Sequence, residues 1–456
     1  MIKYYWKQAW ELLKQHKLFS VLYITGAGLA IAMTMVVFVA HYIRVAPVYP
    51  ETNRAETWVL KSVTVQRVKT RGSGSWQSSH QLVRDWWYPM QEAEQVSAVY
   101  NSWELDDYIQ RENLGSELNV KVKYTDPAFF RIFQFSFLAG KPFSQADFES
   151  GIMNAVVGED LARRLFGTTE VVGKTFSLNY TDCRIVGVVK DASFLTRDSF
   201  AQLYLPYTTV AGYDKDSKSD AGMLGPYTVY FKVKDDAMGA ALEAAMHEMV
   251  RKYNTSQEEN KLVLSGPDVY WKSVYRRGNV PLDWWELIRL WGGLVLIFLL
   301  VPALNLCAMI STRMENRLPE MGICKAFGAD RGRLLRQILI ENLILTCLGG
   351  LLGLCWVWTI LIAGRNWVFT LFERYGNSAP EGVDTIVSFD MLFSPWIFCA
   401  GFIVCLLLNL FSALWPAWKA LGKDIVYTLN QKKKKEGDAM LHLIGKNLWA
   451  RRYRYG

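Results

Sequence analysis

Histidine is scarce in this sequence and is scattered along it. Its five histidines are too far apart in sequence to indicate a metal site built on imidazole ligands: His16, His41, His80, His247 and His442. His247 and Glu248 match the start of an H-E-x-x-H zinc motif, but Arg251 stands where the second histidine is needed. We therefore expect neither a metal site nor any other cofactor bound by this chain.

Cysteine is also rare outside the most apolar parts of the chain. The sequence has seven cysteines, and only Cys183 lies between residues 44 and 286. Cys324 lies in a polar stretch, and the others lie in apolar windows. An intramolecular disulfide within residues 44–286 is therefore excluded, and that region must be stabilised by its own apolar core.

The sequence lacks the motifs of common catalytic sites. It has no G-x-S-x-G nucleophile motif. Residues 167–175, GTTEVVGKT, resemble a phosphate-binding loop, but five residues separate the two glycines where that motif has four. A strand-like segment also follows Lys174 where the motif needs a helix. We interpret this stretch as a turn and expect the chain not to be an enzyme.

Charge is missing from four long windows, although charged residues make up 21% of the chain. Each window can cross about 30 Å of hydrocarbon as a helix, which takes about 20 apolar residues. We therefore predict an α-helical membrane domain of four transmembrane helices. The windows without Lys, Arg, Asp or Glu are residues 18–42, 290–310, 343–363 and 391–417.

The N-terminal window follows basic and aromatic residues, among them Lys3, Trp6, Trp10 and Lys17. A cleaved signal peptide also has a basic start and an apolar run. Here the run is longer than a signal core and no A-x-A cleavage pattern follows it, so we expect an uncleaved anchor. We expect residues 1–17 to form an amphipathic helix in contact with membrane lipids.

Lysine and arginine are concentrated in residues 1–17, 311–337 and 418–456. Because basic flanks stay on the cytoplasmic side, we expect these segments and both termini to be cytoplasmic. The net charge of +8 follows from this bias, so we expect no nucleic-acid partner. The basic-aromatic end of the tail has the same character as residues 1–17 and fits a surface helix or the remnant of a second copy, and both interpretations stay open.

The predicted parts of the chain follow from these windows and flanks. They are an interfacial helix (1–17), transmembrane helices (18–43, 287–310, 338–363, 391–417), a large extracytoplasmic domain (44–286), a cytoplasmic segment (311–337), an extracytoplasmic loop (364–390) and a basic tail (418–456).

Residues 44–286 alternate between strand and helix patterns. We predict a strand at 56–66, a Gly/Ser turn at 72–75, a helix at 79–95 and a strand at 96–103. Near the end we predict a strand at 227–233, a helix capped by Asp235 and running to about Tyr253, and a strand at 261–265. This order predicts a large α+β domain, inserted between the first and second transmembrane helices, that itself contains an inserted subdomain.

The inserted subdomain contains two further patterns. NAVVGEDLARRLFG predicts a short buried strand that runs into a helix, and GKTFSLNYTDCRIVGVV predicts a hairpin with its turn at 179–182.

The stretch between the second and third windows contains a short helical pattern. Pro319 suits a first helical position, and Gly328 can end the helix that follows. A helix lying at the membrane face could transmit force to a soluble partner, and a plain basic loop would fit the same pattern. The pattern by itself leaves both interpretations open.

This stretch resembles the signature of FtsX/MacB-type ABC transporter permeases, in which a serine-arginine exit and an E-x-G-x-x-K-A-x-G-A helix precede a third transmembrane helix. Residues 119–190 resemble the MacB-like periplasmic core domain of the same family, and residues 414–430 resemble its exit from the fourth helix. The signature is matched by Asn305, Ser311, Arg313, Glu315, Glu320, Gly322, Lys325, Ala326, Gly328, Ala329, Arg336, Gln337, Glu341, Gly349, Gly350 and Gly353.

The resemblance implies partners and a coupling site. It implies that a separate cytoplasmic ABC ATPase, which binds ATP and Mg²⁺, docks on the short helix, and that a second permease chain, identical or different, associates in the membrane. The residues expected to couple to the ATPase are Glu320, Met321, Gly322, Lys325, Ala326, Gly328 and Ala329.

Small residues in the first and third windows are expected to let helices approach closely, since packing drives helix association in lipid. These are Gly26, Gly28, Gly349 and Gly353, and contact within one chain or between two chains would explain them equally. Glu341 is expected to be a structural anchor, with a direct coupling contact as the alternative. Pro302 is expected to kink the second helix.

The resemblance implies a non-catalytic permease subunit of an inner-membrane ABC transporter or mechanotransmission complex. It would couple ATP hydrolysis to movement of the outer domain, for export or extraction of peptide, lipoprotein or drug-like substrates. The alternative is a membrane-anchored receptor or signalling scaffold that regulates an envelope partner protein without transport.

Overall fold

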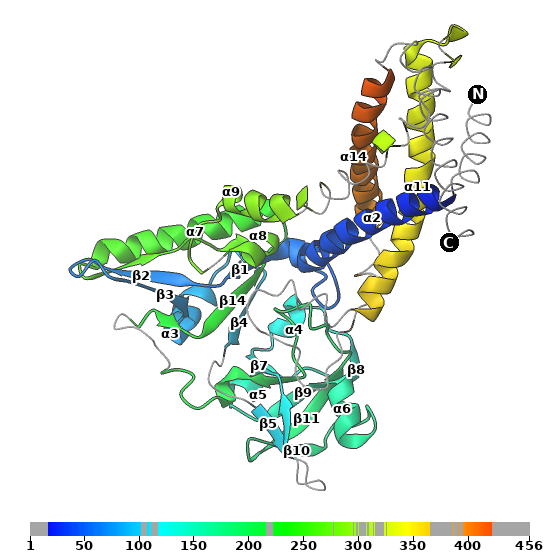
Figure 1. The fold of residues 1–456 in the computed structure, drawn as a ribbon. Helices are drawn as coiled ribbons and strands as arrows, with labels where there is room; N and C mark the ends of the chain where they lie inside the picture. Colours follow the sequence, from blue (N-terminus) through cyan, green and yellow to red (C-terminus); the bar gives the residue numbers. More distant parts are fainter. Residues whose placement is uncertain are drawn as a thin grey trace, which may run out of the picture. The chain divides into compact units, whose positions relative to one another are not determined.

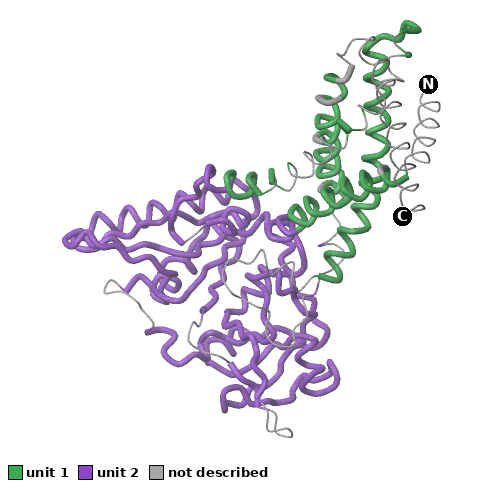
Figure 2. Tube along the Cα trace, viewed as in Figure 1, with its two compact units in different colours: residues 1–39, 288–364, 393–456 green, residues 40–287, 365–392 purple. Residues whose placement is uncertain are grey.

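The computed structural model describes residues 17–101, 107–110, 117–215, 222–276 and 278–294, short stretches between 296 and 330, and residues 331–364, 386, 391 and 395–421. The chain divides into two compact units (Figure 2). A helical unit contains residues 1–39, 288–364 and 393–456, and an α+β unit contains residues 40–287 and 365–392. The predicted interfacial helix and most of the basic tail lie outside the described residues.

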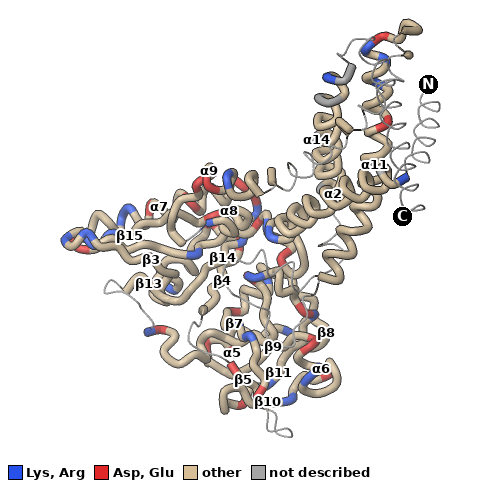
Figure 3. The backbone as a smooth tube through the Cα atoms, in the orientation of Figure 1, with Lys and Arg blue, Asp and Glu red and all other residues tan. Residues whose placement is uncertain are grey.

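Three long helices dominate the described part of the helical unit (Figure 1). They are α2 (Lys17–Val45), α11 (Arg331–Ala363) and α14 (Pro395–Leu421). Each contains a segment long and apolar enough to cross a membrane, and these segments are almost free of charged side chains (Figure 3). The second predicted helix is described only in part, beginning with a short π-helical turn, η4 (Ile288–Gly292). Four transmembrane helices therefore stay a prediction.

The helices extend beyond the predicted spans for local reasons. Asp330 caps α11 by accepting a hydrogen bond from the Gly332 amide (3.1 Å), so α11 begins seven residues before the predicted span at 338. The last seven residues of the predicted cytoplasmic segment, 331–337, are thus helical. A buried apolar cluster that includes Tyr23, Ala27, Leu345 and Ala413 joins α2, α11 and α14.

The first lobe of the α+β unit is formed by residues on both sides of an insertion. Its strands are β1 (Thr57–Leu60), β2 (Val63–Arg67), β3 (Ser73–Ser78), β4 (Gln95–Tyr100), β13 (Leu224–Gly225), β14 (Tyr227–Lys232), β15 (Asn260–Val263) and β16 (Asp268–Val269). Its helices are the 3-10 turn η1 (Arg54–Glu56), α3 (His80–Leu82), the π-helical turn η2 (Val83–Trp87), α7 (Asp236–Ser256), α8 (Tyr270–Tyr275) and α9 (Trp284–Leu287).

The second lobe lies between β4 and β13 in the sequence, as the predicted insertion requires. Its strands are β5 (Asp107–Gln110), β6 (Glu117–Val120), β7 (Val122–Thr125), β8 (Phe137–Gly140), β9 (Asn154–Gly158), β10 (Thr175–Leu178), β11 (Thr181–Val189) and β12 (Leu203–Pro206). Its helices are α4 (Phe129–Ile132), α5 (Gln145–Glu149), α6 (Glu159–Phe166) and the 3-10 turn η3 (Tyr207–Thr209).

Hydrogen bonds link the strands of both lobes into one sheet. Its main path runs β15-β2-β3-β14-β4-β7-β12-β9-β11-β10-β5-β6. The lobes meet where β4 pairs antiparallel with β7, Val99 opposite Thr125. One buried cluster includes Trp58, Leu242 and Leu161, and a second, rich in aromatic rings, includes Phe129, Phe133 and Tyr204. The α+β class expected for residues 44–286 is confirmed.

Several local predictions are wrong for identifiable reasons. The helix predicted over 79–95 stops after η2, because Pro89 has no amide hydrogen with which to continue the helical hydrogen bonds. The strand predicted over 56–66 is broken at Lys61 and Ser62 into β1 and β2, which pair with different strands. The Gly/Ser segment predicted as a turn at 72–75 is mostly β3, and the turn instead precedes it, at Arg71 with φ +53°.

Other local predictions are confirmed. Asp235 caps α7 by accepting a hydrogen bond from the Met238 amide (2.8 Å). The strand-to-helix pattern at 154–166 is β9 followed by α6, which ends at Gly167 with φ +74°. The hairpin of β10 and β11 has a turn of only Asn179 and Tyr180, with φ +47° and +64°. This turn is two residues shorter than the one predicted at 179–182.

Candidate functional site

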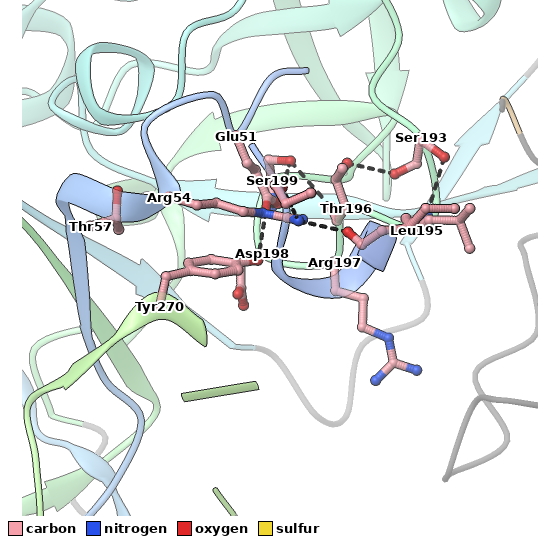
Figure 4. A network of polar contacts seen from close by, with 12 residues as sticks. Glu51, Arg54, Thr57, Ser193, Leu195, Thr196, Arg197, Asp198, Ser199 and Tyr270 are labelled. Carbon is pink, nitrogen blue, oxygen red and sulfur yellow. Dashed lines mark hydrogen bonds and ion pairs between the residues drawn. The ribbon is translucent and has the colours of Figure 1, made fainter. Parts of the chain in front are cut away.

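The end of α2 continues into a polar network buried within the α+β unit. Three segments meet there: the outgoing linker (residues 46–56), the returning segment (residues 268–280) and a loop between β11 and β12 (residues 191–202). We call these three segments together the junction (Figure 4). The linker and the returning segment are the chain's two direct connections from the α+β unit to the first and second apolar windows.

Arg54 binds the end of α2. Its Nη1 donates hydrogen bonds to the carbonyl oxygens of Ile43 (2.6 Å) and Ala46 (2.5 Å). The last carbonyl groups of a helix have no partners within the helix and carry its partial negative charge. The buried guanidinium therefore satisfies acceptors that burial would otherwise leave without a partner.

Glu51 neutralises Arg54 and connects it to the other two segments. Its Oε2 accepts hydrogen bonds from Arg54 Nε (2.8 Å) and the Tyr270 hydroxyl (2.5 Å), and its Oε1 accepts from the amide (2.9 Å) and hydroxyl (2.7 Å) of Ser199. Glu51 and Arg54 are only 1% and 3% exposed. A buried ion pair whose hydrogen bonds are all satisfied holds its residues in one specific arrangement. Removing either partner would leave the other charge buried without a counter-charge, which is strongly unfavourable.

Electrostatics reinforce this arrangement. Burial alone would lower the pKa of Arg54, but the Glu51 carboxylate and Tyr270 raise it above its ordinary value. Burial alone would raise the pKa of Asp198, yet Lys61 and Lys123, with hydrogen bonds from tyrosines, hold it below its ordinary value. Both groups therefore stay charged across the physiological pH range.

The outgoing linker is anchored at several further points. The Tyr49 hydroxyl donates to the Lys190 carbonyl (2.9 Å) and accepts from the Ser136 amide (3.1 Å). Thr52 Oγ1 donates to Gln134 Oε1 (2.8 Å). The linker is thus fixed both to the residue that follows β11 and to the segment after α4, which makes it a stiff connection.

The returning segment is held in a similar way. Arg276 pairs with the buried Asp268, with Nη2 to Oδ1 at 2.6 Å, and its Nη1 donates to the Val280 carbonyl (3.0 Å). Asn279 Nδ2 donates to Thr64 Oγ1 (2.8 Å) in β2. The segment stays bound to the first lobe up to four residues before α9.

The two connections also contact each other. The Tyr275 hydroxyl on α8 lies 3.0 Å from the imidazole of His41 on α2, and the two rings stack with centroids 5.3 Å apart. Tyr270, at the other end of α8, binds Glu51 of the linker. A displacement of the end of α2 would therefore act on the returning segment directly.

The predicted coupling residues are only partly described. Ala326 is helical and exposed, Gly328 has φ +82°, and the Ala329 amide donates to the Cys324 carbonyl (3.0 Å), so a helix ends here as expected. Phe327, which the site prediction omitted, is 88% exposed. The other predicted coupling residues, Glu320, Met321, Gly322 and Lys325, lie outside the described residues, as does Pro302. Their role stays a prediction.

Three of the four glycines expected to allow close helix packing lie where α2 meets α11. A Cβ on Gly28 would lie 2.9 Å from the Gly349 carbonyl oxygen, and one on Gly353 would lie 2.7 Å from the Gly28 carbonyl oxygen. A Cβ on Gly26 would meet no described atom within 4 Å. Gly28, Gly349 and Gly353 thus pack within one chain.

Glu341 is buried on α11 at 2% exposure, with Gln337 Nε2 3.4 Å from its Oε1. This placement agrees with a structural anchor. Within the described residues, no group of three or more His, Cys, Asp or Glu side chains is arranged to hold a metal ion.

Sequence reasoning missed the junction. Glu51 and Arg54 occupy a polar stretch, YPETNRAE, whose composition is typical of an exposed loop. Ser199 and Tyr270 are far from it in sequence and carry no motif. Only the fold brings these residues together.

Comparisons with known proteins agree with this architecture. The MacB-like periplasmic core domain matches residues 20–249, and the FtsX-like permease C-terminal domain matches residues 292–425. The ABC transporter permease YknZ of Bacillus subtilis (strain 168) is 25% identical over 315 residues, which are 69% of this chain and 70% of that protein.

A second relative is longer than this chain. The macrolide export ATP-binding/permease protein MacB of Agrobacterium fabrum is 26% identical over 317 residues, 68% of this chain but 43% of that protein. Among solved structures, the periplasmic region of MacB from Actinobacillus actinomycetemcomitans matches with a TM-score of 0.32 and 16% identity, covering 44% of this chain and 88% of that one.

Apolar helices and an extracytoplasmic α+β domain near the N-terminus define an integral membrane protein with a folded domain outside the membrane. The chain belongs to the FtsX/MacB-type family of ABC transporter permeases, which are inner-membrane proteins that work with a cytoplasmic ABC ATPase.

Proposed function

We propose that this chain is the non-catalytic permease subunit of a transport or mechanotransmission complex. ATP and Mg²⁺ bind to a separate cytoplasmic ATPase, and hydrolysis there moves the extracytoplasmic domain. The chain crosses the membrane four times with both termini in the cytoplasm, and a second permease chain, identical or different, completes the complex.

The observation that carries this proposal is the Glu51–Arg54 pair at the end of α2. A helix that moves in the membrane can move an outer domain only if the connection between them is stiff. Here the helix end, the linker and the returning segment share one buried hydrogen-bond network. A flexible linker would dissipate the same movement.

On the cytoplasmic side, the exposed Phe327 and Ile323 support docking of a partner. They lie in the short helix that the family resemblance assigns to ATPase contact, and they are 88% and 44% exposed. Exposed bulky apolar side chains on a polar segment are characteristic of protein contact sites. Glu320, Met321, Gly322 and Lys325 complete the proposed contact.

The proposed substrates are peptide, lipoprotein or drug-like molecules, which the complex exports or extracts from the membrane with the help of an envelope partner protein. One relative is named as a macrolide exporter. The name of this relative supports drug-like molecules among the three proposed substrate classes.

The test is copurification from native membranes, followed by measurement of ATP hydrolysis. We expect an ATPase to copurify with the wild-type chain, and we expect Glu320→Ala and Phe327→Ala to reduce the amount recovered at least fivefold. The control is Glu258→Ala, at an exposed position of the α+β unit, which should change nothing. Absence of any ATPase in the wild-type preparation would favour a membrane-anchored receptor or signalling scaffold instead.

A further inference from the structure

The loop between β11 and β12, residues Asp191–Gln202, is irregular in backbone yet largely buried. Ser193, Thr196 and Ser199 are at most 2% exposed. Connecting loops normally run over the surface, because buried backbone groups need partners. This loop supplies its own: the Ser193 carbonyl accepts from Thr196 Oγ1 (2.7 Å), and the Thr196 carbonyl accepts from the Phe200 amide (2.7 Å). The result is a compact element with a fixed shape.

One side of this loop receives the connections to the membrane helices. Ser199 binds Glu51 of the outgoing linker through both its amide and its hydroxyl (Figure 4). The Ser193 hydroxyl donates to the carbonyl of Ile386 (2.5 Å), which lies in the chain segment between the third and fourth apolar windows. The returning segment reaches the same place through Tyr270 and Glu51.

The two ends of the loop form hydrogen bonds to the β9–α6 unit of the second lobe. Asp191 Oδ2 accepts a hydrogen bond from the Asp160 amide (2.9 Å), in the first turn of α6. At the other end, the Gln202 carbonyl accepts from the Gly158 amide (2.9 Å) at the end of β9. The fit is close, since a Cβ on Gly158 would lie 2.4 Å from Asp191 Oδ1.

We propose that residues 191–202 form a relay that passes displacement of the α2 end to the β9–α6 unit, with Ser199 as the positioning residue that contacts the linker and Asp191 as the one that contacts α6. This inference deepens the proposed function and rests on it. The relay follows a hydrogen-bonded route from Arg54 to α6: Arg54 to Glu51, Glu51 to Ser199, through the loop, and Asp191 to Asp160. The second lobe is then the part of the extracytoplasmic domain that responds to the membrane helices.

A first experiment tests the coupling without ATP. Hydrogen exchange is measured by mass spectrometry on the full chain in lipid nanodiscs. We expect Arg54→Lys, which weakens the grip on the α2 end, to speed exchange at Gly158 and Asp160 at least threefold. Arg251→Lys, at an exposed position on α7, is the matched control and should leave both amides unchanged. Unchanged exchange at Gly158 and Asp160 in Arg54→Lys overturns the relay.

Two substitutions at Asp191 separate transmission from simple destabilisation. Asp191→Asn keeps an oxygen acceptor for the Asp160 amide, and Asp191→Ala removes it. In combination with Arg54→Lys, we expect the effect on the Asp160 amide to persist with Asn and to fall below 1.5-fold with Ala, because Ala removes the acceptor through which the loop holds this amide. An undiminished effect with Ala would contradict the assignment of Asp191.

A second experiment uses the complex with its copurified ATPase. Fluorophores are introduced as unnatural amino acids at Thr169, after α6, and Glu243, on α7, and the distance between them is followed by energy transfer. We expect ATP to shift this distance in the wild type and in Asp191→Asn, and not in Asp191→Ala or Ser199→Ala, while the ATPase rate stays within twofold in all four.

The outcomes of the two experiments distinguish the two ideas. A distance shift that survives in both alanine variants overturns the relay and leaves the proposed function standing. No ATP-dependent shift in the wild type contradicts the proposed function, and the exchange experiment still decides the relay.

Discussion

Arg54 and Glu51 show how a charged pair can be placed at the end of a membrane helix. Neither side chain is exposed to water, yet every charge has a partner: two helix-end carbonyls, a tyrosine hydroxyl, a serine and each other. Desolvating charges is costly, so such a pair adds little stability compared with apolar residues of the same shape. Its value is the fixed geometry that it gives to the connection.

The pair predicts strongly non-additive mutational effects. We expect Arg54→Met to destabilise the α+β domain by about 3–5 kcal/mol, because it leaves the Glu51 carboxylate buried without its cation. The double variant Glu51→Leu with Arg54→Met should lose less than the single variant. Urea unfolding in detergent, followed by tryptophan fluorescence, measures both. A double variant that loses the sum of the two single effects would show that the residues act independently.

Asp191 predicts a pH dependence of stability. Burial, with Asp160 and Glu159 nearby, raises its pKa from 3.8 to about 6 in the folded chain. Between these values the folded chain keeps a proton that the unfolded chain has lost, so stability falls as the pH rises through this window. The change is at most about 3 kcal/mol, at roughly 1.4 kcal/mol per pKa unit.

The control for this prediction is Asp191→Asn, which keeps the hydrogen bond to the Asp160 amide and cannot titrate. Unfolding midpoints measured from pH 4 to pH 7 should decline less steeply in Asp191→Asn than in the wild type. Identical pH profiles would mean that Asp191 is charged throughout this range in the folded chain.

At the scale of elements, α2 and α11 approach closely because glycines of both helices lie at the crossing. Gly28, Gly349 and Gly353 bring backbone atoms of the two helices close together. Near this crossing, the hydroxyl of Tyr23 on α2 lies 3.4 Å from Oγ1 of Thr346 on α11. In lipid, helices associate through such packing rather than through the hydrophobic effect. Gly28, Gly349 and Gly353 already pack against each other's helices within the chain, so a second permease chain would have to bind elsewhere on the helical unit.

A single methyl group tests this crossing. We expect Gly353→Ala to destabilise the helical unit by about 1–3 kcal/mol, since its Cβ would overlap the Gly28 carbonyl oxygen at 2.7 Å and force the helices apart. Gly26→Ala is the matched control, because its Cβ meets no described atom within 4 Å. The thermal unfolding midpoints of the two variants in detergent measure the difference. Equal losses in both variants would argue against close packing at Gly353.

At the scale of the whole molecule, orientation determines whether the proposed mechanism can operate. The positive-inside bias predicts that residues 311–337 and the termini lie in the cytoplasm and that residues 44–286 lie outside, and the proposed function depends on this prediction. Cys324 is exposed and Cys183 is buried, so in a variant that has alanine at the other two exposed cysteines, Cys355 and Cys399, a membrane-impermeant maleimide reports on the short helix. We expect Cys324 to react only after intact cells are opened.

The converse label is a cysteine at an exposed position of the outer domain, Glu258→Cys, which should react in intact cells. Reaction of Cys324 before the cells are opened would place the coupling segment on the same side as the α+β domain. That result would contradict the proposed coupling to a cytoplasmic ATPase.

Local patterns were sufficient where one interaction decides the structure. Three of the four apolar windows, the Asp235 cap, the strand-to-helix step before Gly167 and the helix end at Gly328 all depend on neighbouring residues, and the structure confirms them. Pro89 was a local signal as well, and it would have corrected the helix predicted over 79–95. Composition misplaced the turn of the β2–β3 hairpin, because Ser73, Gly74 and Ser75 pair with Gln66, Val65 and Thr64 although their composition is typical of a turn.

The sequence by itself determined that this chain enters a membrane, that an α+β domain separates its first two apolar windows, and that it resembles a permease family. Hydrophobicity, charge asymmetry and motif spacing are all readable along a single chain. Only the tertiary structure decided how the α+β domain is attached to α2. Glu51, Ser199 and Tyr270 are separated by up to 219 positions, and burial in a common network gives them a role that no local pattern carries.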